Sequence, residues 1–214
     1  MIIDLSHPIG RFTYPGLPPP ELRTVVTRAE TAARLAPGVS FEIESLSLVG
    51  NTGTYIDSPF HYHADKADIA DLPLDRIVDV PVVVVHAEGA TSIGRERLGD
   101  VGRLRGKAVL LRTGWSQHWG TPRYTELDCP HLAADAVGAL IDAGVAVVGI
   151  DSLNIDCPSD EARPAHQGLL GAGIPVIEHL TNLASVPDGA RLTALPAPVR
   201  GMASFPVRAI AVCQ

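Results

Sequence analysis

Runs of apolar residues along the chain predict a fold built mainly from short strands. Stretches rich in Val, Ile and Leu and bounded by glycine, proline or polar residues are typical of strands, and continuous apolar runs are typical of strands buried on both faces. The stretches with this character are residues 2–5, 80–86, 107–112, 145–150, 174–177, 191–195 and 206–213.

Two further runs, at residues 22–30 and 40–49, predict a long hairpin that turns at the Pro-Gly pair at 37–38. In the second run Phe41 and Ile43 alternate with glutamates. A period of two is typical of a strand with one buried face. We therefore expect residues 40–49 to be half buried and to lead the chain into the stretch that follows.

Helical patterns are fewer. Apolar residues at every fourth position predict a helix over residues 131–142, and Gly144 is well placed to end it. Residues 68–77 and 164–170 are each expected to hold one short helix. The pattern predicts an α/β fold in a single domain, residues 1–214, with mixed sheets and few helices.

Residues 50–63 gather more chemically useful side chains than any other stretch. A regular helix is not expected here, because Gly53 and Pro59 interrupt it. We expect a turn leaving a strand end, where side chains converge on a cleft. A carboxylate and imidazoles held in that way suit either a metal ion or proton transfer. The polar residues of this stretch are Asn51, Tyr55, Asp57, His61 and His63.

Composition narrows the expected partners and compartment. The chain has 214 residues, 46% of them hydrophobic, which is enough to bury a sizeable core. A net charge of −7 provides no basic field, so neither nucleic acid nor an anionic membrane is expected as a partner. No apolar run approaches the roughly 18 to 20 residues of a membrane span, and the first residues lack a signal peptide's basic flank. A cytoplasmic protein is expected, with its three scattered cysteines reduced.

The stretch from Asn51 to His61 is similar to the motif His-x-Gly-Thr-His-x-Asp-x-Pro-x-His. Further blocks follow in matching order and spacing: Leu111-Arg112-Thr113-Gly114-Trp115, Val148-Gly149-Ile150-Asp151-Ser152, His166 with Leu169-Leu170, Ile177-Glu178-His179-Leu180-Thr181-Asn182-Leu183, and Phe205-Pro206-Val207-Arg208. Together they resemble the metal-dependent cyclase family, which includes bacterial kynurenine formamidases and isatin hydrolases. The resemblance runs over nearly the whole chain.

The resemblance implies a swivelling β/β/α fold, assembled as a homodimer or homotetramer with active sites near subunit contacts. In the formamidase branch, two metal positions share the motif's aspartate. One of the two ligand sets has lost both its histidines, which are replaced here by Asn51 and Tyr55. An amide and a phenol substitute poorly for imidazole on zinc or manganese, so one divalent metal, Zn or Mn, is expected. The complete ligand set is Asp57, His61, His166 and Glu178.

Three functions follow from this pattern. In the first, a hydrolase uses the one metal to activate water against a small amide, formamide or lactone. Its catalytic residues are His61, Glu178 and Tyr55, with Tyr55 donating a proton or hydrogen bond to the developing oxyanion. In the second, the same His and acid pairs serve a metal-independent cyclase, dehydratase or isomerase of a small metabolite. In the third, the chain is a non-catalytic binder of a small ligand, which the retention of all four ligands argues against.

Substrate-binding residues are expected around the ligands. His63 and His179 flank retained ligands and are expected to contact the substrate or to orient the ligand beside them. Asn51 is expected in the pocket because it occupies the position of a lost ligand. Trp115 fits either the wall of an apolar substrate pocket or packing in the core.

An arginine is expected to bind a substrate carboxylate, if the substrate has one, through its bidentate fork. Arg112, Arg163 and Arg208 are the candidates, and Arg208 is preferred because it lies in the C-terminal block of the resemblance. Asp151 and Asp156, which follow a predicted strand, are expected to fix loops.

Overall fold

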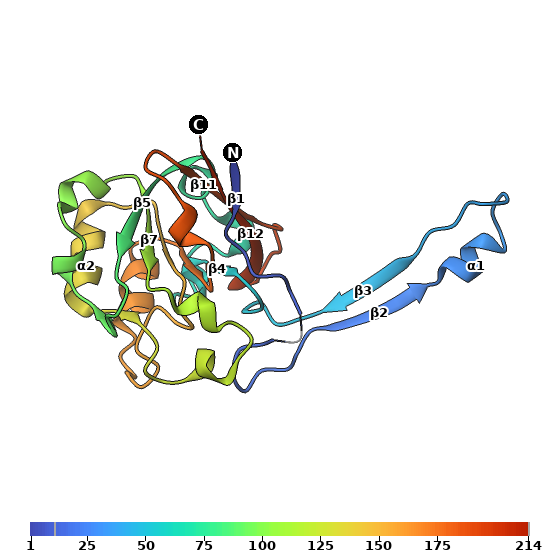
Figure 1. The fold of residues 1–214 in the computed structure, drawn as a ribbon, viewed down its shortest axis with the longest axis horizontal. Coiled ribbons are helices and arrows are strands. Elements are labelled where there is room, and N and C mark those ends of the chain that lie inside the picture. The colour runs from blue at the N-terminus through green and yellow to red at the C-terminus, as the bar shows by residue number, and fades with distance from the viewer. Residues whose placement is uncertain (11, 214) are drawn as a thin grey trace.

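The chain folds around an eight-stranded mixed sheet (Figure 1). The computed structural model describes residues 1–10 and 12–213. Along the sheet the strands are β1 (Ile2–Asp4), β12 (Ser204–Val212), β11 (Arg191–Pro196), β5 (Val80–His86), β7 (Ala108–Arg112), β9 (Val147–Ile150), β10 (Val176–Glu178) and β4 (Tyr55–Asp57). The last strand, β4, also pairs with β12, so the sheet curls back on itself.

The middle of the sheet is parallel, formed by β5, β7, β9 and β10. Alternate residues of β7 enter two different hydrophobic clusters, with Val109 and Leu111 in one and Leu110 in the other. The first cluster includes the apolar face of α2 (Ala134–Ala143). Both faces of the central strands are therefore covered, which explains why their sequences are continuously apolar.

Helices are short. Gly144 ends α2 in the left-handed conformation at φ 68°, as its position predicts. A π-helical turn spans His166–Leu170, and β6 (Ser92–Ile93) pairs with β8 (His131–Leu132) in a separate small sheet. The 3-10 turns are Pro59–His61, Ile69–Asp71, Leu74–Arg76, Arg95–Arg97, Val101–Leu104, Trp115–His118, Pro122–Thr125 and Leu183–Ser185.

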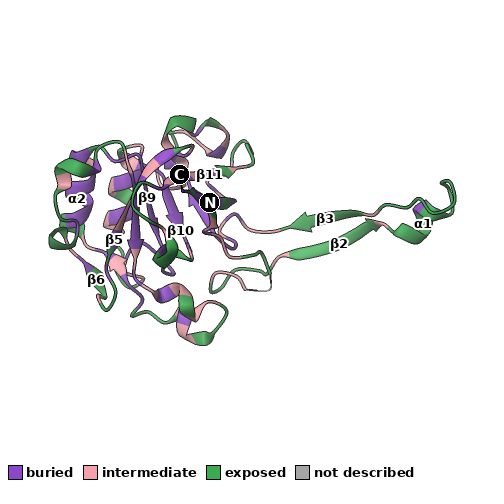
Figure 2. Cartoon of the chain, turned by 45° about the horizontal axis from the view of Figure 1, so that its top comes forward, coloured by how far each residue is buried: buried purple, intermediate pink, exposed green. Residues whose placement is uncertain are grey.

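A two-stranded arm extends away from the rest of the molecule (Figures 1 and 2). It consists of β2 (Glu21–Val26) and β3 (Ile43–Ser47), paired antiparallel, with the short helix α1 (Arg28–Ala32) near its tip. The predicted hairpin is confirmed, except that residues 28–32 are helical. A capping box explains this exception, because Thr27 and Glu30 each satisfy the other's backbone N–H.

The expectation that residues 40–49 are half buried is wrong. All residues of β3 are exposed, including Ile43 and Leu46. Ile43 and Leu46 are three apart and point to opposite faces of the strand. Nothing within this chain covers either side chain in the described residues, and the whole strand is exposed (Figure 2).

The predicted fold class is confirmed: a mixed, mostly β core with few helices. Each predicted strand of the body is present, with boundaries shifted by a few residues. The predicted helix at 68–77 is instead a pair of 3-10 turns. Across residues 1–10 and 12–213, no helix is both long enough and apolar enough to cross a bilayer.

Candidate metal centre and pocket

The strand β4 brings the polar stretch into the body of the sheet. Tyr55 and Asp57 are two apart and therefore point to the same face, whereas Ile56 enters the hydrophobic core on the other. In the register of the sheet, Tyr55 lies opposite Glu178 of β10, and Asp57 lies opposite Ser204 of β12. The predicted turn after the strand is the 3-10 turn that starts at Pro59 and carries His61.

Asp57, His61 and His166 converge so that one ligand atom from each lies within 4.8 Å of the others. His166 Nε2 is 3.7 Å from Asp57 Oδ2 and 3.7 Å from Glu178 Oε1, and His61 Nε2 is 3.9 Å from Asp57 Oδ1. In a tetrahedral zinc site with bonds of about 2.1 Å, ligand atoms lie roughly 3.4 Å apart. The structure therefore brings Asp57, His61 and His166 to nearly the spacing of a metal site, with Glu178 beside His166.

The buried charges of this group fit a cation. Asp57, Asp156 and Glu178 are almost completely buried, with His166 as the buried base among them. Ser204 donates its hydroxyl to Asp57 Oδ1, but the other carboxylate oxygen, Oδ2, has no hydrogen-bond partner. Buried carboxylates are normally paired or bound to a metal, so a divalent ion would satisfy this oxygen and neutralise excess negative charge.

Asp156 fixes the orientation of His166. Its Oδ2 lies 2.6 Å from His166 Nδ1, and the carboxylate also accepts the backbone N–H groups of Ala165 and His166 at 2.6 Å and 3.0 Å. The loop-fixing role predicted for Asp156 is thus present, and an orienting role is added to it. Because Nδ1 is hydrogen-bonded to Asp156, the other ring nitrogen, Nε2, points toward the candidate metal position. The same arrangement occurs in many carboxylate–histidine–metal sites.

Tyr55 and Glu178 form a buried pair. The Tyr55 hydroxyl donates to Glu178 Oε2, and the backbone N–H of Ile155 donates to Oε1 at 2.6 Å. Burial, with the nearby Glu178 charge, raises the pKa of Tyr55 well above its usual value, so the phenol keeps its proton. Burial also raises the pKa of Glu178 to about 7, although the charge on His166 opposes this shift.

The two histidines differ in their electrostatics. Burial lowers the pKa of His61, and the nearby Asp57 only partly opposes that change. Burial would also lower the pKa of His166, but its hydrogen bond with Asp156 and the nearby charges of Glu178 and Asp57 outweigh burial and raise the pKa to about 10. The imidazole of His166 is therefore both basic and held in a fixed orientation.

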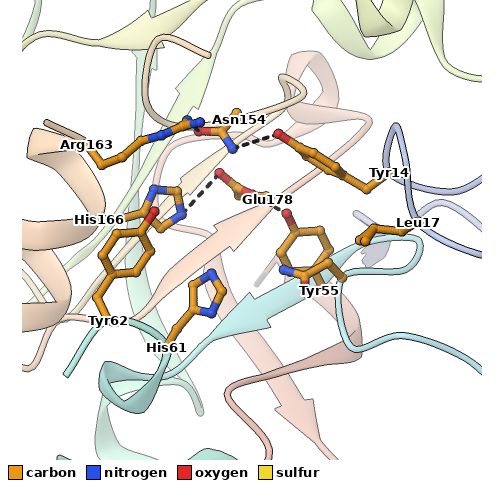
Figure 3. A pocket seen from close by; sticks show the side chains of 10 residues that line it. Tyr14, Leu17, Tyr55, His61, Tyr62, Asn154, Arg163, His166 and Glu178 are labelled. Carbon is orange, nitrogen blue, oxygen red and sulfur yellow. Dashed lines mark hydrogen bonds and ion pairs between the residues drawn. The ribbon is translucent and has the colours of Figure 1, made fainter. Parts of the chain in front are cut away.

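A pocket of about 220 Å³ opens onto this group (Figure 3). It brings together residues from the N-terminal loop, from the motif and from the segment before the π-helical turn. The sequence offered no signal for Tyr14 or Leu17, which are distant along the chain, and Tyr62 and Asn154 were also missed. The lining residues are Tyr14, Leu17, Asn51, Tyr55, His61, Tyr62, Asn154, Arg163, His166 and Glu178.

Four predicted substrate-binding residues lie outside the lining of this pocket. His179 is buried, with its ring nitrogens 2.9 Å from the carbonyl oxygens of Gly53 and Leu153. His63 Nε2 lies 3.1 Å from the carbonyl of Gln167. The remaining two are Trp115, which packs in an aromatic cluster and donates to the Tyr124 carbonyl, and Arg208, which is exposed and paired with Asp4.

Comparison with known proteins identifies relatives over almost the whole chain. A family model described as "Putative cyclase" matches residues 3–157. A kynurenine formamidase of Bacillus cereus is 30% identical over 211 residues, covering 97% of this chain and 95% of the relative. A kynurenine formamidase of Salinibacter ruber is 35% identical over 212 residues, covering 98% of this chain and 96% of the relative.

Solved structures agree on the fold. Isatin hydrolase A from Labrenzia aggregata, bound to benzyl benzoate, superposes with a TM-score of 0.82 at 22% identity, covering 99% of this chain and 93% of that chain. A structure described as "Potential Metal-Dependent Hydrolase With Cyclase Activity" superposes with a TM-score of 0.79 at 25% identity, covering 99% and 96%. The overall fold is therefore shared with these proteins.

Proposed function

Because the chain belongs to the cyclase family, we propose that it is a hydrolase that uses one divalent metal ion, zinc or manganese, against a small amide, formamide or lactone. The similarity to kynurenine formamidases and to isatin hydrolase supports cleavage of a C–N bond. The main support for a bound metal is a buried oxygen of Asp57, Oδ2. It has no hydrogen-bond partner and lies 3.7 Å from His166 Nε2.

The retained ligand set would hold the ion, and Asn51 and Tyr55 would line the pocket beside it. When bound, a zinc or manganese ion lowers the pKa of a coordinated water and polarises a carbonyl oxygen. Hydrolysis of a formamide then consumes one water and yields formate and an amine. The chain's own residues have to orient the ligands, exclude bulk water and move the proton.

His61 is the site residue best placed to meet both solvent and substrate. Its side chain is 30% exposed, whereas those of Asp57, His166 and Glu178 are at most 4% exposed. The lowered pKa keeps its imidazole neutral near pH 7, which is the form that binds a metal or accepts a proton.

Tyr55 orients Glu178. Its single hydroxyl proton is donated to Glu178 Oε2, so donation to a substrate oxyanion requires that this hydrogen bond be exchanged. We therefore assign Tyr55 first to holding the carboxylate in place and second to stabilising the oxyanion.

Removal of the metal is expected to abolish hydrolysis reversibly. Protein purified without a histidine tag should carry near-stoichiometric zinc or manganese by mass spectrometry. Dialysis against a chelator should lower the turnover of formanilide at least about tenfold, since water is no longer activated, and adding back zinc or manganese should restore it. Protein that stays metal-free in the presence of both ions, yet remains active, would contradict the metal-dependent function and favour the metal-independent alternative.

We propose that the chain self-associates through the arm, which would give the expected homodimer or homotetramer. Leu22 and Leu46 face each other across the strands, and they are 71% and 52% exposed. An isolated two-stranded hairpin is marginally stable in water. Apolar side chains that stay exposed to water do not stabilise it, and a patch of them is typical of an interaction site. A second copy of this chain is the partner that would cover this surface.

Replacing both Leu22 and Leu46 with lysine is expected to disrupt the oligomer, since charged side chains resist burial. Light scattering coupled to size-exclusion chromatography should show a parent of at least twice the chain mass and a variant that shifts toward the monomer. Leu74→Lys, a change at a similarly exposed leucine outside the arm, is the control and should keep the parent mass. A monomeric parent would refute the proposed self-association.

A further inference from the structure

Arg163 is a pocket-lining cation without a carboxylate partner. Its guanidinium pairs with no Asp or Glu in the described part of the chain, and its own contacts are to neutral groups. The other candidate arginines differ. Arg112 Nε lies 2.5 Å from Glu88 Oε1, and Arg208 Nη2 lies 2.6 Å from Asp4 Oδ2. Of the three, only Arg163 offers its full charge to a molecule in the pocket.

Neutral acceptors hold the Arg163 side chain in place. Nη1 donates to Asn154 Oδ1 at 3.5 Å, and Nη2 donates to the carbonyl of Pro158 at 3.3 Å. These contacts orient the guanidinium without cancelling its charge. The Arg163 backbone also adopts φ 47°, a left-handed conformation that is strained for a side chain of this kind. Such strain concentrates at ligand-binding positions.

Tyr14 completes a polar wall beside Arg163. Its hydroxyl oxygen accepts a hydrogen bond from Asn154 Nδ2 at 3.2 Å, which leaves the hydroxyl proton available to a ligand (Figure 3). Burial raises the pKa of Tyr14, and the Arg163 charge partly opposes that rise. Arg163 and Tyr14 share Asn154 as a hydrogen-bond partner and line the same pocket.

We propose that Arg163 and Tyr14 bind a carboxylate carried by the substrate, at a position separate from the bond that is cleaved. This inference rests on the proposed hydrolase function and narrows its substrate to an amide that also bears a carboxylate. Tyr62 lies stacked on His166 at 5.0 Å and 15°, and with Leu17 it gives the pocket aromatic and apolar walls. These walls favour an aromatic ring between the carboxylate and the metal ligands.

The first test measures binding by calorimetry on metal-loaded protein, with anthranilate and aniline as probes that differ in one carboxylate. The parent should bind anthranilate, and Arg163→Gln should bind it about tenfold to thirtyfold more weakly, because a charge-assisted bidentate contact is lost. Arg163→Lys should recover part of the affinity. Arg208→Gln is the matched control, since Arg208 lies outside the pocket, and it should match the parent.

The second test compares turnover of N-formylanthranilate and formanilide, which share the scissile formamide. Arg163→Gln should raise KM for the acid about tenfold to thirtyfold and leave kcat/KM for formanilide within about twofold. Equal losses with both substrates would indicate a structural role only and overturn the carboxylate site, as would a parent that does not bind anthranilate. A parent that binds anthranilate through Arg163 but hydrolyses neither substrate would support the site and contradict the proposed hydrolase.

Discussion

Replacement of Asp57 by asparagine is expected to remove the metal and to lower kcat/KM at least about a thousandfold. Asparagine has nearly the same size and can still accept the hydrogen bond from Ser204. It lacks the negative charge that the unpartnered Oδ2 contributes, and a neutral amide is a poor ligand for zinc or manganese. The loss should therefore come from the metal centre and not from unfolding.

Metal content by mass spectrometry and turnover of formanilide measure this effect, and thermal unfolding reports the fold. Asp151→Asn is the matched control, because Asp151 is also buried but accepts hydrogen bonds from Thr113 and Gly114 away from the pocket. That variant should lower Tm and keep the metal. An Asp57→Asn protein that retains a full equivalent of metal and parental turnover would show that the centre is assigned to the wrong residues.

Replacement of Asp156 by asparagine is expected to weaken metal affinity about tenfold to a hundredfold while leaving every metal ligand in place. The carboxylate holds His166 Nδ1 at 2.6 Å and increases the basicity of the ring. Asparagine can preserve the geometry of one hydrogen bond, but it removes the charge behind the imidazole. Competition with a metal-binding dye gives the affinity directly.

The effect at Asp156 is distinguished from general damage by its dependence on metal concentration. Excess zinc or manganese should restore most of the turnover of Asp156→Asn, since the ligands are present and only their affinity is reduced. His166→Ala should not be restored in this way, because it lacks the ligand itself. Unchanged metal affinity in Asp156→Asn would mean that the carboxylate serves only to fix the loop.

Much of the fold was predictable because the central strands are buried on both faces and read as continuous apolar runs. The exposure of the arm was the exception, since the alternation of Phe41 and Ile43 with glutamates does not show whether anything covers the apolar side chains. The same limit applies to Arg163 and Arg208. Residue type gives both the same chemistry, and only the folded chain shows that Arg163 lines the pocket whereas Arg208 pairs with Asp4 at the surface.

The grouping of Asp57, His61, His166 and Glu178 was predictable through the resemblance, because these residues recur in known blocks. Several of the residues that support this group or line the pocket beside it were not predictable. Asp156 lies ten residues before His166, and its role depends on a loop that no local pattern specifies. Tyr14 and Leu17 come from the N-terminal loop, and a loop has no periodicity that would predict which cleft it lines.

The position of β4 between β10 and β12 also determines when the centre can form during folding. Asp57 and Ser204 are 147 residues apart along the chain, and Tyr55 and Glu178 are 123 apart. Contacts of such high contact order form slowly, and a nascent chain lacks them until its C-terminal strand has emerged. A metal ion would then bind only after synthesis and folding are complete. The bound ion would stabilise only those chains in which β4 has paired with both β10 and β12.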